Sequence, residues 1–255
     1  MNLGMLFYMF YTLVTGASSG IGRDICQRLD CLGNNIILMG SSLTKLEETR
    51  ASCVNGENHQ IFCYDLSDID KLDFSFSNFI KSKAIHVDNF VHCAGRFLIE
   101  PVKDIDLNDL KLCFNVNLFS AIVLCQSLLR FSNNRKNLKN VVFVSSISSK
   151  GGAKGVSAYS SSKAGLDGFM RSFAIEMAPY VRINSVLPGA IPTKMTEFLF
   201  SDSESTKKIS AAYPLGLGKV SDIADAVLWL LSGSSRWMTG QELIIDGGRI
   251  VNLSV

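Results

Sequence analysis

The sequence predicts an α/β protein with one doubly wound parallel sheet of about seven strands and helices on both faces. Short apolar segments alternate with helical patterns along the whole length of 255 residues. The apolar segments lack strict polar alternation, which is typical of strands covered on both faces. No linker, repeat or low-complexity stretch divides the chain, so a single domain over residues 9–255 is expected.

The expected elements alternate in order along the chain, and the crossovers between parallel strands are expected to be right-handed. Strands are expected at Met9–Val14, Asn35–Gly40, Gln60–Tyr64, Val87–His92, Asn140–Ser145, Val181–Leu187 and Glu242–Asp246. Helices are expected near residues 20–31, 42–53, 68–81, 106–131, 157–178 and 219–232.

An extra apolar lead, Met1–Tyr8, precedes the first strand. The apolar stretch continues only to Val14, which is shorter than the roughly 20 residues that a membrane span requires. It has neither the basic segment nor the small-residue cleavage site of a signal peptide. No membrane partner is therefore expected.

The composition excludes several classes of protein. Apolar residues make up 47% and charged residues 19% of the chain, which excludes disorder as the dominant state. The net charge of +2 is too small to attract nucleic acid electrostatically. The seven cysteines form no CxxC pair, and the three histidines lack zinc-finger spacing, so no metal site is predicted. Unpaired cysteines indicate a reducing, cytoplasmic location.

A glycine-rich turn, TGASSGIG at residues 15–22, separates the first strand from the first helix. Glycines let backbone N–H groups approach a pyrophosphate, and the helix N-terminus adds a favourable dipole. A turn that needs a positive φ would explain one of these glycines but not three. The strand–turn–helix context therefore predicts a Rossmann-type dinucleotide site. Its expected contacts are Gly16, Ser18, Ser19, Gly20, Ile21 and Gly22.

Three residues capable of acid–base chemistry follow the fifth expected strand. Ser146 lies near its carboxyl end, Tyr159 comes thirteen residues later, and Lys163 four residues after that. Positions i and i+4 share a helix face, so the ammonium is expected beside the phenol, where it would lower the phenol's pKa. Such a tyrosine exchanges a proton with a carbonyl or alcohol oxygen that the serine also hydrogen-bonds. The YxxxK pattern alone is more often an ordinary exposed pair, but together with the glycine turn it favours catalysis.

The GxxxGxG turn and the Ser146, Tyr159 and Lys163 spacing resemble the short-chain dehydrogenase/reductase family, and the similarity runs from residue 11 to about 249. The resemblance implies an oxidoreductase with a Ser-Tyr-Lys-Asn proton relay. In that relay an asparagine holds a water that passes protons to the lysine. Asn117 matches this position, and Asn115 is the competing choice; the Leu-x-Ser that follows favours Asn117.

Further segments extend the resemblance. Asp65-Leu66 is similar to the acidic position that contacts adenine, and Thr193 and the backbone of Ile191 are implied to contact the nicotinamide amide. Cys93 stands where the family has an asparagine that braces the central sheet. Beyond the glycine turn, the implied cofactor-binding residues are Asp65, Leu66, Cys93, Ala94, Gly95, Tyr159, Lys163, Pro188, Gly189, Ile191 and Thr193.

The end of the second strand indicates which cofactor is used. An NAD-preferring site carries an acidic residue there for the ribose 2′-OH, whereas this chain reads Leu-Met-Gly-Ser-Ser at residues 38–42. Nothing at this position repels a 2′-phosphate, and Ser41, Ser42 and Ser18 are able to hydrogen-bond it. The usual arginine is missing too, with Arg23 and Lys45 the nearest basic residues. NADP(H) is therefore favoured, and NAD(H) stays open.

The substrate is expected to be a small carbonyl compound or alcohol held by three loops, Arg96–Lys103, Ser148–Ala158 and Lys194–Tyr213. The length of the last loop resembles that of 3-oxoacyl-[acyl-carrier-protein] reductases, and sugars, small ketones and quinones remain open. An acyl carrier protein would need a basic surface. The cluster Arg130, Arg135, Lys136 and Lys139 offers one, although such a cluster is more often a solvated helix end.

Two other functional classes remain as alternatives. A catalytically idle member of the family would bind NADP(H) as a sensor, and a scaffold would use its helices for assembly only. The intact Ser146, Tyr159, Lys163 and Asn117 argue against the sensor, and the intact cofactor turn argues against the scaffold.

A homo-oligomer is expected, because two helices carry more apolar residues than one core face needs. The resemblance implies pairing through these helices to a dimer, and a second pairing through Asp246-Gly247-Gly248 to a tetramer. A monomer whose helices simply cover a broad sheet is the alternative. The apolar residues are Leu118, Ile122, Leu128 and Leu129 on the first helix and Leu166, Phe169, Phe173 and Ile175 on the second.

Overall fold

The computed structural model describes residues 10–134 and 136–252, and Met9 and the lead Met1–Tyr8 lie outside them. Seven strands form one sheet in the order β3-β2-β1-β4-β5-β6-β7, and every neighbouring pair is parallel. This is the Rossmann-type, doubly wound arrangement that the sequence predicts. The order reverses between β1 and β4, which opens a crevice at the carboxyl ends of these strands.

The strands end within one or two residues of their expected limits. They are β1 (Phe10–Thr15), β2 (Asn35–Gly40), β3 (Gln60–Cys63), β4 (His86–His92), β5 (Asn140–Val144), β6 (Arg182–Pro188) and β7 (Glu242–Ile245). The α-helices are α1 (Gly20–Cys31), α2 (Leu43–Ala51), α3 (Leu72–Ser82), α4 (Leu107–Phe114), α5 (Ser120–Leu129), α6 (Phe131–Asn134), α7 (Ser157–Met177), α8 (Ser203–Ala211) and α9 (Val220–Leu231).

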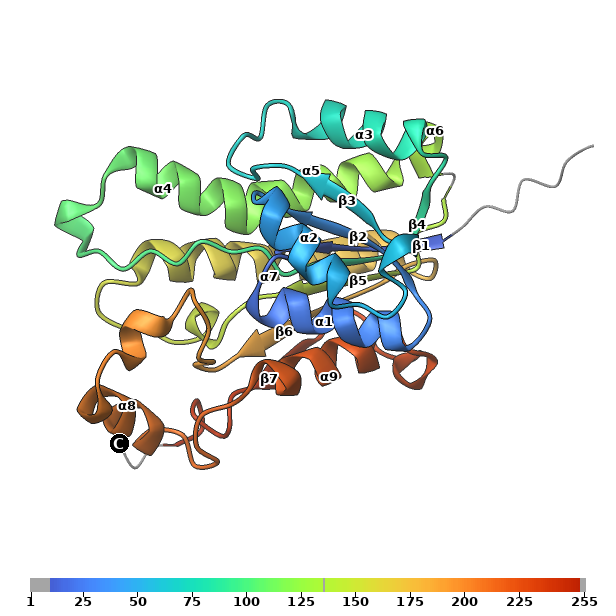
Figure 1. Cartoon of the computed structure of the whole chain (residues 1–255). Helices are drawn as coiled ribbons and strands as arrows, with labels where there is room; N and C mark the ends of the chain where they lie inside the picture. The colour runs from blue at the N-terminus through green and yellow to red at the C-terminus, as the bar shows by residue number, and fades with distance from the viewer. Residues whose placement is uncertain (1–9, 135, 253–255) are drawn as a thin grey trace, which may run out of the picture.

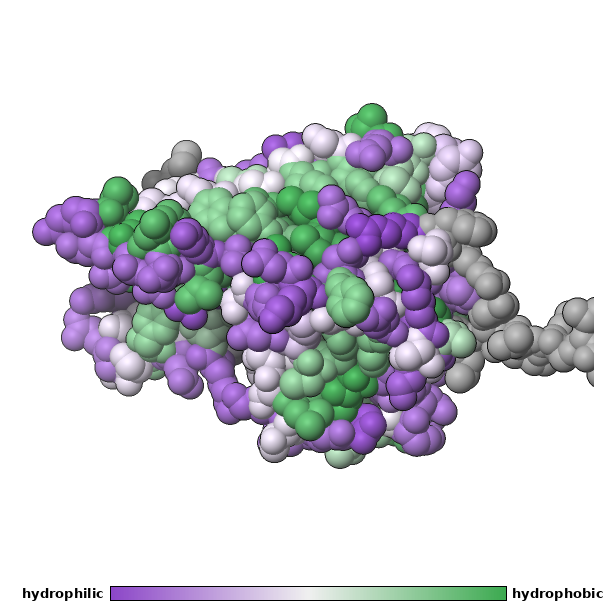
Figure 2. Space-filling view, turned by 90° about the horizontal axis from the view of Figure 1, so that it is seen from above, coloured by the Kyte–Doolittle hydropathy of each residue, from purple (hydrophilic) through white to green (hydrophobic). Residues whose placement is uncertain are grey.

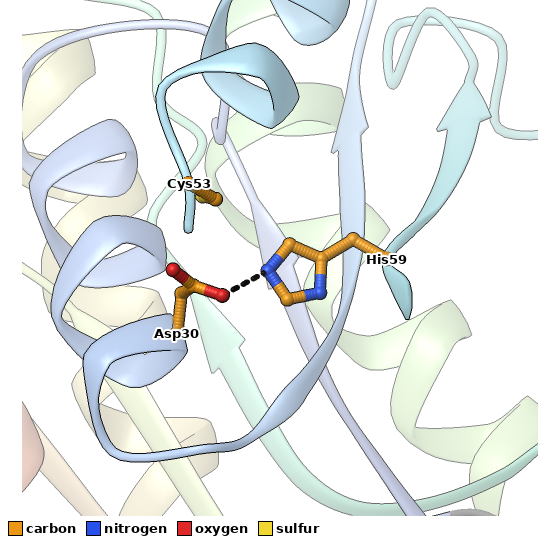
Figure 3. A group of neighbouring side chains, drawn as sticks. All are labelled: Asp30, Cys53 and His59. Atoms are coloured by element: carbon orange, nitrogen blue, oxygen red, sulfur yellow. Dashed lines mark ion pairs between the residues drawn. The ribbon is translucent and has the colours of Figure 1, made fainter. Parts of the chain in front are cut away.

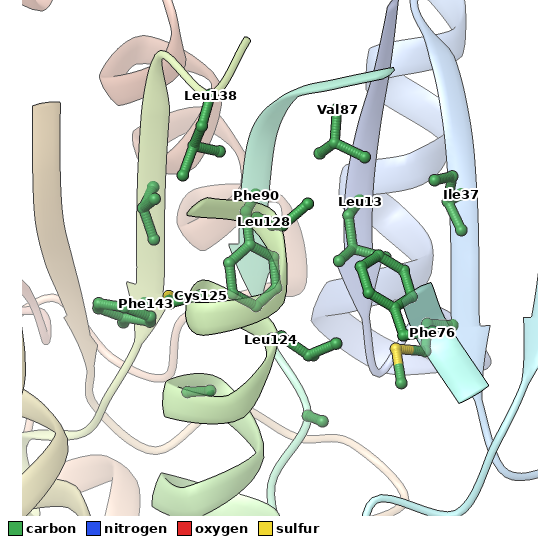
Figure 4. Packing of buried hydrophobic residues seen from close by; sticks show 14 of the residues in the cluster. Leu13, Ile37, Phe76, Val87, Phe90, Leu124, Cys125, Leu128, Leu138 and Phe143 are labelled. Atoms are coloured by element: carbon green, nitrogen blue, oxygen red, sulfur yellow. The ribbon is translucent and has the colours of Figure 1, made fainter. Parts of the chain in front are cut away.

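The sheet is covered on both faces, as the apolar character of its strands requires. In Figure 1, α3 and α5 lie above the sheet and α1 and α9 below it. One buried cluster joins the sheet to α3, α5 and α7, and Figure 4 shows Phe76, Phe90 and Phe143 among its members. The second cluster joins the other face to α1, α2 and α9. Burial on both sides fixes the register of the strands and hence the position of their carboxyl ends.

The helix expected over residues 106–131 is interrupted. A π-helical segment, η3 (Asn115–Phe119), separates α4 from α5. Helix α5 ends at Leu129, because the next residue, Arg130, has an extended backbone. Such widened turns commonly reposition a side chain at a functional site, and this one carries Asn117. The sequence pattern does not reveal it, because apolar periodicity hardly changes over one inserted residue. Helix α8, within the segment Lys194–Tyr213, was also not expected.

One helical stretch of the described chain, Leu107–Leu129, is long and apolar enough to cross a membrane by length and composition. Core helices of globular domains pass the same test, and Leu124, Cys125 and Leu128 of this stretch are fully packed in the core. The stretch is therefore interpreted as a core helix.

Fewer apolar residues are left uncovered on the two predicted long helices than the sequence suggested. Leu128, Leu166 and Phe173 were expected at a subunit contact, but they are buried within the single chain because α5 and α7 both pack on the sheet. Ile175 and Phe119 are exposed. The face seen from above in Figure 2 shows hydrophobic patches interleaved with hydrophilic ones.

Candidate active site

A cleft of about 660 Å³ opens at the carboxyl ends of β1, β4, β5 and β6, where the strand order reverses. Every residue predicted to bind the cofactor lines this cleft, from Gly16 on β1's turn to Thr193 after β6. Ser146, Tyr159 and Lys163 line it as well. Tyr64, Arg96, Phe97, Leu112, Val116, Met195 and Thr196 also line it, although none of them was assigned a role individually.

The glycine turn packs too tightly for side chains. Gly16 has a φ of +69°, and a Cβ there would lie 2.9 Å from the backbone N of Ala94. A Cβ on Gly22 would lie 2.2 Å from the carbonyl oxygen of Gly16. The turn therefore packs against the loop that follows β4. The N-terminal residues of α1 face the cleft. Backbone amides and a helix N-terminus of this kind fit a pyrophosphate.

Tyr159 and Ser146 form a hydrogen-bonded pair on the wall of the cleft. Ser146 follows β5 and is 9% exposed, and Tyr159 lies in the first turn of α7 and is 8% exposed. Burial raises the pKa of Tyr159 to about 12, and the hydrogen bond from Ser146 acts in the opposite direction. The two hydroxyl groups thus converge on one place where an oxygen atom of a ligand would accept two hydrogen bonds.

Lys163 lies one turn further along α7, as the i, i+4 spacing predicts. Its Nζ is 6.0 Å from the centre of the Tyr159 ring and donates a hydrogen bond to the carbonyl oxygen of Val144 at 2.9 Å. Burial lowers the pKa of Lys163 to about 8. The expected lowering of the Tyr159 pKa by Lys163 is wrong for this structure, because desolvation of the phenol outweighs any stabilisation of the phenolate.

Asn117 is fully buried behind the cleft, in η3. Its Nδ2 donates to Ser162 Oγ at 2.9 Å and to the carbonyl oxygen of Arg96 at 3.0 Å, while its Oδ1 accepts from the Arg96 amide at 2.6 Å. A Cβ placed on Gly95 would be 3.5 Å from Asn117 Oδ1 and 3.6 Å from Lys163 Nζ, so the three residues adjoin one another. Asn115 instead donates to the carbonyl oxygen of Ser67 at 2.9 Å, away from the lysine.

A histidine and a threonine brace the loop in which Cys93 replaces the family's asparagine. Thr15 Oγ1 accepts hydrogen bonds from the amides of Cys93 and Ala94, both at 3.1 Å, and lies 3.0 Å from His92 Nδ1. The hydroxyl proton is then donated to Nδ1, which places the imidazole proton on Nε2. Burial lowers the pKa of His92 to about 3, so the ring is neutral, and it lies against the backbone of Val116 and Asn117.

The end of β2 is occupied by hydroxyl groups and one guanidinium. A Cβ on Gly40 would lie 3.5 Å from Ser18 Oγ, so Ser18 stands directly beside the strand end. Arg23 donates to the carbonyl oxygen of Ser18 at 2.8 Å and pairs with Glu48 at 3.1 Å. Ser41 is exposed at the rim of the cleft. No carboxylate follows β2 directly, as the sequence indicates.

The loop after β6 closes the cleft over the glycine turn. A Cβ on Gly20 would lie 3.3 Å from Thr193 Cγ2, and Thr196 Oγ1 donates to the carbonyl oxygen of Ile191 at 2.6 Å. Tyr213 accepts a hydrogen bond from the Ala190 amide at 2.9 Å. Thr196 and Tyr213 thereby fix the segment that the resemblance assigns to the nicotinamide.

Aromatic side chains form the part of the cleft next to the tyrosine. The ring of Phe97 packs edge-on against Tyr159, with 4.6 Å between the ring centres, and Phe198 lies 6.0 Å beyond Phe97. Both rings belong to loops that the sequence singles out for substrate binding. The sequence does not predict that these two rings lie next to Tyr159, because they come from segments far from it in the chain.

The fold and this site define a nucleotide-dependent oxidoreductase, and comparisons with known proteins agree. A family model described as enoyl-(acyl carrier protein) reductase matches residues 16–249. L-xylulose reductase from Mesocricetus auratus is 31% identical over 241 residues, covering 94% of this chain and 96% of that protein. Glucose 1-dehydrogenase from Gluconobacter oxydans (strain 621H) is 31% identical over 240 residues, covering 92% and 90%. The chain therefore belongs to the short-chain dehydrogenase/reductase family.

Solved structures agree with this membership. 4-Hydroxyisoleucine dehydrogenase complexed with NADH is 25% identical, covers 95% of this chain and 99% of that chain, and superposes with a TM-score of 0.87. A short-chain glucose/ribitol dehydrogenase from Brucella melitensis is 27% identical, covers 94% and 96%, and gives a TM-score of 0.85. An oxidoreductase that uses a nicotinamide cofactor on a small molecule follows from the family and the site together.

Proposed function

We propose that this protein is an NADP(H)-dependent oxidoreductase that interconverts a ketone and a secondary alcohol. The observation that carries the proposal is the convergence of Ser146 and Tyr159 in a cleft whose other end is the glycine turn. A proton donor, an oxygen-binding hydroxyl and a pyrophosphate cradle within one cleft are what carbonyl reduction requires.

The chain's own residues manage the proton. The bound nicotinamide supplies or accepts the hydride. Ser146 orients the carbonyl oxygen. As the carbonyl carbon is reduced, the C=O π electrons move onto this oxygen, and the Tyr159 hydroxyl protonates it, which gives the alcohol and leaves a tyrosinate. Because its pKa is about 8, Lys163 exchanges protons near neutral pH and so reprotonates the tyrosine. Asn117 holds the Arg96 backbone that forms the floor of the cleft beside the lysine.

The preference for NADP(H) is supported by the chemistry at the end of β2. Ser18 and Ser41 line the cleft and offer hydrogen bonds to a 2′-phosphate, and no carboxylate directly after β2 repels it. The relatives do not decide the matter: one neighbour is complexed with NADH, and carbonyl reductase [NADPH] 2 from Sus scrofa is 30% identical to this chain.

Sugars and polyols are the substrate class we favour. The relatives named for such substrates include L-xylulose reductase, glucose 1-dehydrogenase and L-rhamnose 1-dehydrogenase (NAD(P)(+)), each 30–31% identical over more than nine-tenths of this chain. Among the residues that line the cleft, Ser146, Tyr159 and the half-exposed Arg96 offer polar groups to substrate hydroxyls.

Reduction of a 3-oxoacyl thioester is the second candidate. The apolar wall formed by Phe97, Phe198 and Met195 beside Tyr159 suits an acyl chain better than a polyol. Of the basic cluster that would hold an acyl carrier protein, Arg130 is paired with Asp73, and Arg135 lies outside the described residues. The basic cluster therefore adds little to this candidate.

Two further properties belong to the proposal. We propose a homo-oligomer, dimeric or tetrameric, supported by the exposed Phe119 at the end of η3 and the exposed Ile175 on α7. A cytoplasmic location is supported by the seven free cysteines.

Oxidation of NADPH by the purified protein in the presence of a panel of ketones tests the function. The panel should contain ketoses such as L-xylulose, simple alkyl and aryl ketones, and acetoacetyl-coenzyme A. Turnover of ketoses with NADPH supports the favoured reading, and turnover of the thioester alone supports the second. NADPH binding without turnover of any member would favour a sensor and contradict catalysis.

A further inference from the structure

A second group of chemically active side chains lies at the opposite, amino-terminal end of the sheet. Asp30 is in the last turn of α1, Cys53 follows α2, and His59 directly precedes β3. One oxygen of Asp30, one ring nitrogen of His59 and the sulfur of Cys53 all lie within 4.8 Å of one another. Figure 3 shows these three side chains meeting between α1 and the loop that leads into β3.

His59 is the unusual member of the group. It is 2% exposed, and among the described residues neither of its ring nitrogens has a hydrogen-bond partner. Its Nε2 lies 3.1 Å from Asp30 Oδ1, close enough for an ion pair. Burial lowers the pKa of His59 despite the adjacent carboxylate, so the ring is neutral. Nε2 becomes a metal ligand once the imidazole proton is carried by Nδ1.

The carboxylate of Asp30 is already oriented by its surroundings. Oδ2 accepts from the Val54 amide at 2.6 Å, and Oδ1 accepts from the amide and side chain of Asn55 at 3.0 and 3.1 Å. These three bonds hold the carboxylate in place, and they leave the second lone pair of Oδ2 free for a further partner. Outer hydrogen bonds of this kind typically fix metal-binding carboxylates.

Cys53 connects the group to solvent. It is half-buried and lines a second cleft of about 590 Å³ together with Glu47, Arg50, Ala51, Gly56 and Glu57. An ion could enter by this route, and water from the cleft could complete its coordination. The charged groups around the three side chains are Asp30, Glu57 and Arg50, and the neighbouring thiols are Cys26 and Cys31.

We propose that Asp30, Cys53 and His59 form a binding site for Zn²⁺, with water as the fourth ligand. A nitrogen, a sulfur and a carboxylate oxygen are the donors that zinc prefers. Tetrahedral zinc with bonds of about 2.0–2.3 Å places its ligand atoms about 3.5 Å apart. The ligand atoms here lie within 4.8 Å of one another, so the largest separation needs to shorten by about 1.3 Å. The ion would tie α1 to the loop before β3 and so stabilise the edge of the sheet.

The thiolate gives the site a signature that unspecific binding lacks. Zinc and cobalt bind cysteine in its deprotonated form, so binding should release the thiol proton of Cys53 and form a metal–thiolate bond.

The test uses the full-length protein with Zn²⁺, and with Co²⁺ as a spectroscopic substitute. We expect one ion per chain, a thiolate-to-cobalt charge-transfer band, and a Tm raised by roughly 5–10 °C when free zinc is about a hundred times Kd. Cys53→Ser should abolish the band and weaken zinc binding at least tenfold, and His59→Gln should also weaken it. Cys63→Ser, which changes an exposed cysteine on β3, should change nothing.

Two results would overturn the proposal. These are the absence of binding by the wild type at micromolar zinc and a cobalt band that persists in Cys53→Ser. Cys53→Ser is nearly isosteric, and NADPH binding or circular dichroism would confirm that this variant folds. The test therefore does not depend on His59→Gln, which changes a buried side chain.

Discussion

The ammonium of Lys163 donates to the carbonyl oxygen of Val144 at 2.9 Å while it lies 6.0 Å from the centre of the Tyr159 ring. The carbonyl group of the last residue of β5 thus fixes the lysine ammonium. The tyrosine lies on the preceding turn of the same helix. Because both groups are buried, the phenol's pKa is raised and the amine's is lowered. These two shifts bring the lysine, and not the tyrosine, into the neutral pH range.

The buried lysine should cost stability at neutral pH. Its pKa is about 8 in the folded chain against an ordinary lysine value of 10.5, so the unfolded chain binds more protons between these limits. Below pH 8 the full cost is present, and it is relieved as pH rises toward 10.5. Lys163→Met should therefore raise the free energy of unfolding by about 1–3 kcal/mol at pH 7 and by less at pH 10.

Urea unfolding of both proteins at several pH values checks this expectation. Lys81→Met, on the exposed side of α3, is the matched control and should show no such dependence. A Lys163→Met variant that is less stable than the wild type at pH 7 would show that the hydrogen bond to Val144 outweighs desolvation.

Acid should destabilise the fold through His92. Its pKa is about 3 in the folded chain against an ordinary histidine value of 6.5, so the unfolded chain takes up a proton first as the pH falls. Stability from the neutral ring is fully present above pH 6.5 and is lost progressively toward pH 3. His92→Asn, which keeps an acceptor for Thr15, should flatten the decline between pH 6 and 4. Equal slopes for the two proteins in urea titrations at these pH values would refute this role.

The end of β2 should set the cofactor preference. Ser41→Asp places a carboxylate where the 2′-phosphate is expected, and like charges repel. We expect kcat/KM for NADPH to fall at least tenfold while the value for NADH changes less than threefold. Ser41→Asn, similar in size but neutral, is the control and should retain the wild-type preference. A wild type that already prefers NADH would contradict the proposed assignment.

The two asparagines of η3 should behave differently. Asn117→Ala removes hydrogen bonds to Ser162 and to both backbone groups of Arg96, and should lower stability by about 2–4 kcal/mol and kcat at least a hundredfold. Asn115→Ala removes one bond to Ser67 and should keep kcat within threefold. Steady-state kinetics and urea unfolding measure both effects. Comparable losses of kcat in the two variants would argue against a special place for Asn117.

The fold could be predicted because its signals are local. Seven apolar runs, each bounded by polar or glycine residues, sufficed to locate the strands, and the glycine turn identified the end of β1. The residues around the cleft were found because the carboxyl ends of parallel strands meet at one edge. Tyr159 and Lys163 were placed side by side by helix geometry alone.

Other features depend on contacts between distant segments. The π-helical segment that carries Asn117 leaves no mark in the apolar pattern. Three hydrogen bonds of the site also have no signal in the sequence spacing. They join Lys163 to Val144, Thr15 to His92, and Arg23 to Ser18. Burial, which reverses the expected direction of the Tyr159 pKa, likewise appears only in three dimensions.

The central claim is that Tyr159 donates the proton in an NADPH-dependent carbonyl reduction. Tyr159→Phe keeps the ring that packs on Phe97 and removes the acid, and Tyr180→Phe, which changes an exposed tyrosine, is its matched control. The most direct measurement is kcat for NADPH oxidation with the best ketone of the panel, together with NADPH binding by fluorescence. The account predicts that Tyr159→Phe binds NADPH within threefold of the wild type and loses at least a thousandfold in kcat, while Tyr180→Phe is unchanged. A Tyr159→Phe enzyme that keeps most of the wild-type kcat would contradict it.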